Sequence, residues 1–125
     1  MASELILITE DNEKSRKLIR ELLRVKGYQT IETETAEEGI RIAQESRPAL
    51  ILMDLQLPGM DGFAALASLR ADPRTRAIPV IAVTASLMTH SRPQILAAGF
   101  DGYQGKPINL KEFLEVVRQM LDSPR

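Results

Sequence analysis

The chain has 125 residues, of which 17 are acidic and 16 basic, and it carries a net charge of −1. This near-neutral charge argues against a general affinity for nucleic acid, which needs a basic surface, and the lack of cysteine excludes disulfides and thiolate metal sites. No apolar run has the length of a membrane span or the form of a signal peptide, so we expect one domain over residues 1–125, in the cytoplasm.

The first third of the chain predicts two strands and two helices. Residues 5–8 form an apolar run that indicates a strand, and Asn12 is a good N-cap for a helix that Gly27 ends. The apolar residues that recur at helical spacing in this helix are Leu18, Ile19, Leu22 and Leu23. Residues 28–33 indicate a weaker strand nearer a sheet edge, and Thr35 opens the second helix with a T-x-x-E capping box.

The central strand is the clearest element in the sequence. Residues 50–53 are all apolar and the run ends at Asp54, a pattern typical of a strand buried on both faces. Pro58 and Gly59 turn the chain, and Asp61 can cap a third helix. The apolar residues of that helix are Phe63, Leu66 and Leu69.

The last third predicts two more strands and two more helices. Residues 78–83 form the fourth strand, which ends at Thr84, and a short helix follows from Ser91 and Pro93 with Ile95 and Leu96 directed inward. Residues 101–105 form a brief fifth strand. The final helix carries an apolar stripe of Leu110, Phe113, Leu114, Val117 and Leu121.

Strands and helices therefore alternate five times with short connections. Such an alternation predicts a parallel sheet covered by helices on both faces. With right-handed crossovers, a chain of this length favours a flavodoxin-like, doubly wound α/β fold with strand order 2-1-3-4-5.

Polar residues follow the strands of this sheet at the points where the strands end. Glu10 and Asp11 follow the first strand, Asp54 ends the third, Thr84 ends the fourth and Lys106 follows the fifth. Ligands bind outside the carboxyl ends of such strands, and three crowded carboxylates need a proton or a hard cation such as Mg²⁺. A cation, a hydroxyl group and a metal around one carboxylate suit a phosphoryl group, so we expect phosphoryl transfer onto Asp54.

Each residue also has an ordinary structural interpretation when taken alone. The acidic pair Glu10-Asp11 suits a helix N-terminus, Asp54 a turn, Thr84 a locally bonded hydroxyl and Lys106 a solvated turn. Their joint occurrence at successive strand ends is what indicates a functional site.

The chain resembles the response-regulator receiver domains of two-component signalling (CheY-like), of the stand-alone single-domain type, over essentially its whole length. The segments that carry the resemblance are Glu10-Asp11, the run MDLQLPGMDG that contains Asp54, Val83-Thr84-Ala85 and Gly105-Lys106-Pro107. The resemblance implies that Asp54 is the phosphoacceptor. It also implies a Mg²⁺ site made by Glu10, Asp11, Asp54 and the backbone carbonyl of Gln56.

The same resemblance implies how the phosphoryl group acts. Lys106 would pair with it, Thr84 would bond one of its oxygens, and Tyr103 matches the aromatic switch residue of the family. The phosphodonor would be a phosphohistidine on a histidine kinase or a histidine phosphotransfer protein. The output would pass to a protein that binds the surface made by the fourth helix, fifth strand and fifth helix, with no direct contact to nucleic acid or membrane.

Other functions compete with this interpretation. A Mg²⁺-dependent phosphatase with an aspartyl nucleophile needs a second acid where Gln56 stands, so we expect no enzyme activity beyond self-phosphorylation and self-dephosphorylation at Asp54. In a flavin carrier, the acidic residues 10–11 would repel the phosphate. A binding module that has lost phosphorylation would not need all five site residues. The chain could also be the receiver piece of a hybrid kinase or a multidomain regulator, or a phosphorelay intermediate.

Overall fold

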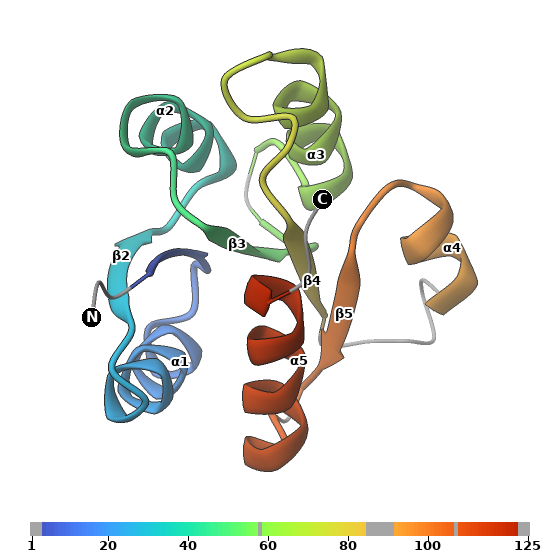
Figure 1. Cartoon of the computed structure of the whole chain (residues 1–125). Helices are drawn as coiled ribbons and strands as arrows, with labels where there is room; N and C mark the ends of the chain where they lie inside the picture. The colour runs from blue at the N-terminus through green and yellow to red at the C-terminus, as the bar shows by residue number, and fades with distance from the viewer. Residues whose placement is uncertain (1–3, 58, 85–91, 107, 123–125) are drawn as a thin grey trace.

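Five parallel strands form one sheet in the order β2-β1-β3-β4-β5 (Figure 1), in a computed structural model that describes residues 4–57, 59–84, 92–106 and 108–122. The strands are β1 Leu5–Thr9, β2 Gln29–Thr33, β3 Leu50–Asp54, β4 Val80–Thr84 and β5 Gly102–Gly105. This is the predicted order, with the weak second strand at an edge. The expectations for Pro58 and Ser91 lie outside the described residues.

Five helices connect and follow the strands, and capping side chains mark where four of them begin. The helices are α1 Glu13–Val25, α2 Ala36–Ser46, α3 Gly62–Ala71, α4 Arg92–Ala97 and α5 Leu110–Asp122. Asn12, Thr35, Asp61 and Asn109 each accept a hydrogen bond from a backbone N–H three residues later. The sequence predicts the first three of these caps. The capping box of α2 is only half formed, because the Glu38 carboxylate pairs with Arg41.

The sheet divides the core into two layers because successive strand residues point to opposite faces. One layer packs under α1 and α5, and the other under α2, α3 and α4 (Figure 1). The first layer contains Ile6, Ile8, Leu50, Leu52, Ile81 and Val83, together with Ile19, Leu23, Phe113 and Val117 of the helices. The second contains Leu7, Ile51, Met53, Val80 and Ala82, together with Leu66, Leu69, Ile95 and others. The uninterrupted apolar runs thus belong to strands buried on both faces.

Helical periodicity predicts burial less well at the ends and flanks of helices. The prediction that Leu96 points inward is wrong: it is 39% exposed, whereas Ile95 is fully buried. Adjacent helical residues point about 100° apart, so Leu96 is turned away from the core that Ile95 enters. Leu110 and Leu18 are also exposed, at 55% and 44%, although both fit the predicted stripes. Strand β4 begins at Val80 rather than Ile78, since Pro79 has no N–H to donate to a neighbouring strand.

None of the helices in the described residues has the length and apolar character that crossing a membrane requires.

Candidate functional site

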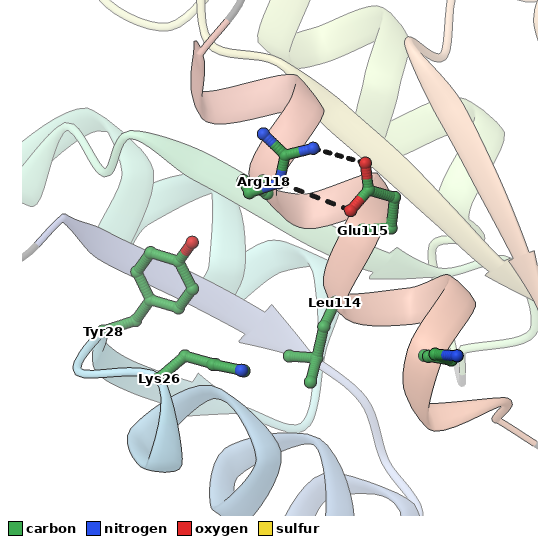
Figure 2. A pocket seen from close by; sticks show the side chains of 6 residues that line it. Lys26, Tyr28, Leu114, Glu115 and Arg118 are labelled. Atoms are coloured by element: carbon green, nitrogen blue, oxygen red, sulfur yellow. Dashed lines mark hydrogen bonds and ion pairs between the residues drawn. The ribbon is translucent and has the colours of Figure 1, made fainter.

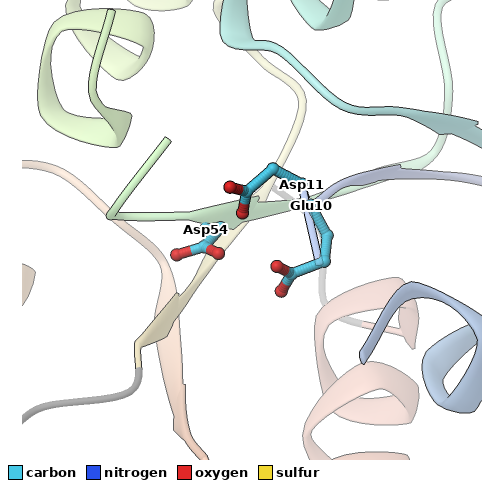
Figure 3. A group of neighbouring side chains, drawn as sticks. All are labelled: Glu10, Asp11 and Asp54. Atoms are coloured by element: carbon cyan, nitrogen blue, oxygen red, sulfur yellow. The ribbon is translucent and has the colours of Figure 1, made fainter. Parts of the chain in front are cut away.

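Three carboxylates meet at the carboxyl ends of two neighbouring strands. Strands β1 and β3 pair in parallel, with Thr9 opposite Met53. Glu10 and Asp11 follow β1, and Asp54 ends β3, so the three side chains offer oxygens that lie within 4.8 Å of one another (Figure 3). Glu10 and Asp54 are almost fully buried, at 2% and 4% exposure, while Asp11 is exposed. The predicted convergence is therefore present.

Lys106 brings a positive charge to this cluster. Its Nζ lies 2.7 Å from Glu10 Oε1 and 3.3 Å from Asp54 Oδ2. The Glu10 contact is a close ion pair with a carboxylate that is almost fully buried. Strand β4 holds the backbone in place: the Lys106 N–H, directly after β5, donates to the carbonyl oxygen of Thr84 at the end of β4 at 2.8 Å. One cation thus spans two of the three acids.

Both oxygens of Asp54 are held. Oδ1 accepts a hydrogen bond from the Gln56 backbone N–H at 2.9 Å, and Oδ2 faces Lys106. Helix α3 begins directly beneath this loop, where Gly62 is required: a Cβ there would lie 2.8 Å from the Asp54 carbonyl oxygen and 2.9 Å from Leu55 Cα. The carboxylate is therefore fixed in direction before any ligand arrives.

The two proposed switch residues lie on the neighbouring strands. Thr84 is buried at the end of β4, and its strand neighbour Val83 pairs with Asp54 across the sheet. Tyr103 pairs with Ala82 and is half-buried against the core layer beneath α2, α3 and α4. The structure thus places Thr84 beside the phosphoacceptor candidate and Tyr103 one strand further along.

Burial and mutual repulsion shift the proton equilibria of this cluster. Burial and the neighbouring Asp54 raise the pKa of Glu10 from 4.5 to about 7, although Lys106 and the N–H of Asn12 oppose the rise. Burial alone would lower the pKa of Lys106, but its contacts with Glu10 and Asp54 outweigh that effect, so its pKa is raised. The site therefore holds more negative charge than one lysine neutralises.

The donor set fits a hard divalent cation. All three side chains offer carboxylate oxygens, the ligands that Mg²⁺ prefers, and a second positive charge would offset the burial and the neighbouring Asp54 that raise the pKa of Glu10. Glu10, Asp11 and Asp54 are accordingly the residues that would hold it. Gln56 is exposed in the same loop, and its backbone carbonyl remains a predicted ligand.

One contact of the site was not anticipated from the sequence. Arg16 Nη1 donates to the Glu10 carbonyl oxygen at 3.0 Å, and Arg16 Nε lies 3.3 Å from a Glu32 carboxylate oxygen. The available signal was an arginine six residues after the acidic position, one turn into the following helix. Arg16 binds a backbone atom, and the pattern of side chains in a sequence does not predict such a contact.

A surface hollow of about 290 Å³ lies between the α1–β2 connection and α5 (Figure 2). Lys26 and Tyr28 line one side of it, and Leu114 and the Glu115–Arg118 ion pair line the other. Its lining includes none of the carboxylates of the site, so it is a separate surface feature.

Comparison with known proteins gives one consistent result. Residues 6–118 match the family model of the response regulator receiver domain. The chain is 42% identical over 116 residues to the polar-differentiation response regulator DivK of Brucella anthropi, covering 93% of this chain and 94% of that protein.

Solved structures agree with the sequence comparison. The receiver domain of a sensor histidine kinase from Pseudomonas aeruginosa, with a magnesium ion coordinated in the active site cleft, is 33% identical with a TM-score of 0.90, covering 98% of this chain and 100% of that one. The signal receiver domain of a histidine kinase from Syntrophus aciditrophicus is 31% identical with a TM-score of 0.86, covering 95% and 90%. The chemotaxis response regulator CheY4 of Vibrio cholerae, at 22% identity and a TM-score of 0.87 over 96% and 100%, shares the fold.

Proposed function

Because the chain belongs to the response regulator receiver family, we propose that Asp54 accepts a phosphoryl group from a phosphohistidine of a sensor kinase or phosphotransfer protein. The observation that carries the proposal is the position of Asp54. It is a buried carboxylate at a strand end, with Lys106 on one oxygen and two further acids within 4.8 Å. Phosphorylation-dependent binding of another protein is the output.

The transfer breaks the N–P bond of the donor histidine and forms an O–P bond to an Asp54 carboxylate oxygen. The Gln56 N–H and Lys106 hold that carboxylate in one direction, which lowers the entropic cost of reaching an in-line geometry. A bound Mg²⁺ neutralises charge on the transferring group. Lys106 supplies a further positive charge at the same point. Gln56 cannot act as an acid or base, so turnover of other phosphate compounds is not expected.

We propose that Thr84 and Tyr103 couple phosphorylation of Asp54 to a change at the protein surface. A phosphoryl oxygen is a strong acceptor, and the Thr84 hydroxyl beside it can form a charge-assisted hydrogen bond. Movement of Thr84 changes the space beneath β4, where the half-buried Tyr103 ring packs. The ring buries apolar area when it turns inward, so phosphorylation biases two states of similar free energy.

The proposed output surface is made by α4, β5 and α5. A hollow of about 210 Å³ lies between these elements. Its lining includes Leu96 of α4, Tyr103 of β5, and Val116 and Met120 of α5. Because Tyr103 and the exposed Leu96 both border the hollow, a change in the ring position alters the surface that a partner meets.

The phosphodonor is proposed to dock on the α1–α5 side. Arg20 and Arg24 contact β2, so Leu18 lies on the opposite flank of α1, which faces α5. Leu18, in the second turn of α1, and Leu110, the first residue of α5, are exposed large apolar residues on helices that begin at the edge of the sheet that carries Asp54. Exposed apolar side chains of this kind indicate contact with another protein.

Two phosphodonors distinguish the chemistry at Asp54 from docking of the kinase. Acetyl phosphate needs only the site, whereas a phosphorylated histidine kinase must also dock. With Mg²⁺, wild-type protein should take up phosphate from both, and Asp54→Asn from neither. Leu110→Lys should lose transfer from the kinase and keep uptake from acetyl phosphate. Equal uptake by wild type and Asp54→Asn would contradict the phosphoacceptor assignment.

A second reading has one specific support: two of the similar structures are receiver domains of histidine kinases. On this second proposal, the chain is a phosphorelay intermediate and passes its phosphate to a histidine phosphotransfer protein. Rapid loss of phosphate from Asp54 to such a protein would favour a relay role. Stable retention would favour output through binding.

A further inference from the structure

We propose that Arg16 is a positioning residue of the metal site, and that it acts through the backbone carbonyl of Glu10. The inference rests on the proposed Mg²⁺ site. Arg16 is mostly buried, with 17% of its side chain exposed, and it lies on the face of α1 that looks toward the edge strand β2. It touches none of the three carboxylates of the site in the described residues.

The Arg16 guanidinium makes two close contacts with different nitrogen atoms, and its Nη1 also lies 3.9 Å from the exposed Glu34 carboxylate. Nη1 donates to the Glu10 carbonyl oxygen at 3.0 Å, and Nε lies 3.3 Å from Glu32 Oε1. Glu32 is itself held by Arg20 Nη1, which donates to both of its oxygens at 3.2 and 3.0 Å. Glu32 of β2 therefore fixes the orientation of the guanidinium that binds the Glu10 carbonyl oxygen.

The Glu10 carbonyl oxygen controls the direction of Asp11. A peptide unit is planar, so fixing the Glu10 oxygen also fixes the N–Cα bond of Asp11. The other end of Glu10 is fixed as well, because its N–H donates to the Thr33 carbonyl at 3.0 Å. Arg16 thus completes a backbone clamp at the turn between β1 and α1.

Asp11 needs this clamp more than its neighbours do. Glu10 and Asp54 are buried and contact Lys106, whereas Asp11 is exposed and its carboxylate makes no hydrogen bond or ion pair within the described part of the chain. Its place within 4.8 Å of the other two acids therefore depends on its backbone. Without Arg16, the peptide plane can rotate and carry Asp11 away from a cation.

The direction in which the Mg²⁺ affinity changes when Arg16 is replaced distinguishes a positioning role from a purely electrostatic one. Removing a positive charge near a cation site would strengthen Mg²⁺ binding if Arg16 acted only through its charge. Removing a group that orients a ligand weakens metal binding, typically by about 10- to 100-fold. Positioning therefore predicts weaker binding in Arg16→Met, and a purely electrostatic role predicts stronger binding.

The test is a titration with Mg²⁺ alone, followed by amide chemical shifts, with no phosphodonor present. Arg16→Met should raise the dissociation constant by about tenfold. The matched control is Arg20→Met. Arg20 lies one turn later in α1 and binds the same Glu32, but it does not contact Glu10. This variant should bind Mg²⁺ as the wild type does. In chelator the two variants should melt at similar temperatures, so that lost binding is not lost folding.

Unchanged or stronger Mg²⁺ binding in Arg16→Met, or equal weakening in both variants, would overturn the inference. If Arg16→Met does not fold, Arg16→Lys replaces it, because lysine keeps the charge but cannot hold two partners with a planar fork. Its dissociation constant should lie above that of the wild type, and an unchanged value would overturn the inference. A wild type that shows no Mg²⁺ shifts would overturn the metal site itself.

Discussion

The buried carboxylate of Glu10 should make the metal-free protein less stable as the pH rises. Burial and Asp54 raise its pKa from 4.5 to about 7, so the folded state holds this proton more tightly than the unfolded state. A carboxyl group with a raised pKa contributes stability that is fully present below pH 4.5 and is lost as the pH rises through about 7. Above that pH, the folded protein must carry a buried anion with only partial compensation.

The magnitude follows from the two pKa values. Their separation, at about 1.4 kcal/mol per pH unit, corresponds to about 3 kcal/mol of unfolding free energy. Glu10→Gln has nearly the same shape and is always neutral. Without metal and above pH 7, this variant should therefore be more stable than the wild type by up to about 3 kcal/mol. Near pH 4.5 the two proteins should be almost equally stable.

Urea unfolding in chelator, at a series of pH values, measures this difference. Comparing the two proteins at each pH cancels the other titrating groups, which they share. Millimolar Mg²⁺ should then stabilise the wild type above pH 7 by RT ln(1 + [L]/Kd), and should stabilise Glu10→Gln less. A stability difference that does not change with pH, or a wild type that gains stability relative to Glu10→Gln as the pH rises from 4.5 to about 7, would refute this account of Glu10.

Two further expectations concern the groups that support the site. Gly62→Ala should destabilise the fold by about 1–3 kcal/mol, because the added Cβ would meet backbone atoms at the end of β3. Gly102→Ala is the control and should be tolerated, since its Cβ would have neighbours no closer than 3.6 Å. Equal melting temperatures of the two variants would contradict the close approach at Gly62. Asp101→Ala should cost about 2–3 kcal/mol, because Asp101 Oδ2 accepts from Arg70 and from the backbone N–H that begins β4, both at 2.8 Å. The exposed pairs of Arg118 make Arg118→Met the control, with a cost within about 0.5 kcal/mol, and chemical denaturation compares the two.

The fold was predictable because its main signals are local. Buried strands show as continuous apolar runs, and Asn12, Thr35 and Asp61 mark helix starts by their own side chains. Strand order then followed from connection rules, and strand order alone brought Glu10 and Asp54 together. The central part of the site needed no long-range information beyond topology.

The remaining features depend on pairs of groups that sequence periodicity does not describe. Arg70 reaches Asp101, 31 positions away, and Arg16 reaches a backbone oxygen; both contacts depend on how helices lie against the sheet. Leu96 and Leu110 fit an apolar pattern but lie where the helix passes beyond the core. Periodicity reports which face a residue is on, not whether another element covers that face.

The measurement that tests the central claim most directly is chemical trapping of the phosphorylated residue. Protein treated with acetyl phosphate and Mg²⁺ is reduced with borohydride, which converts an aspartyl phosphate to homoserine, and mass spectrometry of its peptides locates the change. The account predicts homoserine at position 54 in the wild type, and none anywhere in Asp54→Asn or in wild type kept in chelator. Conversion at another aspartate, with Asp54 unchanged, would contradict it.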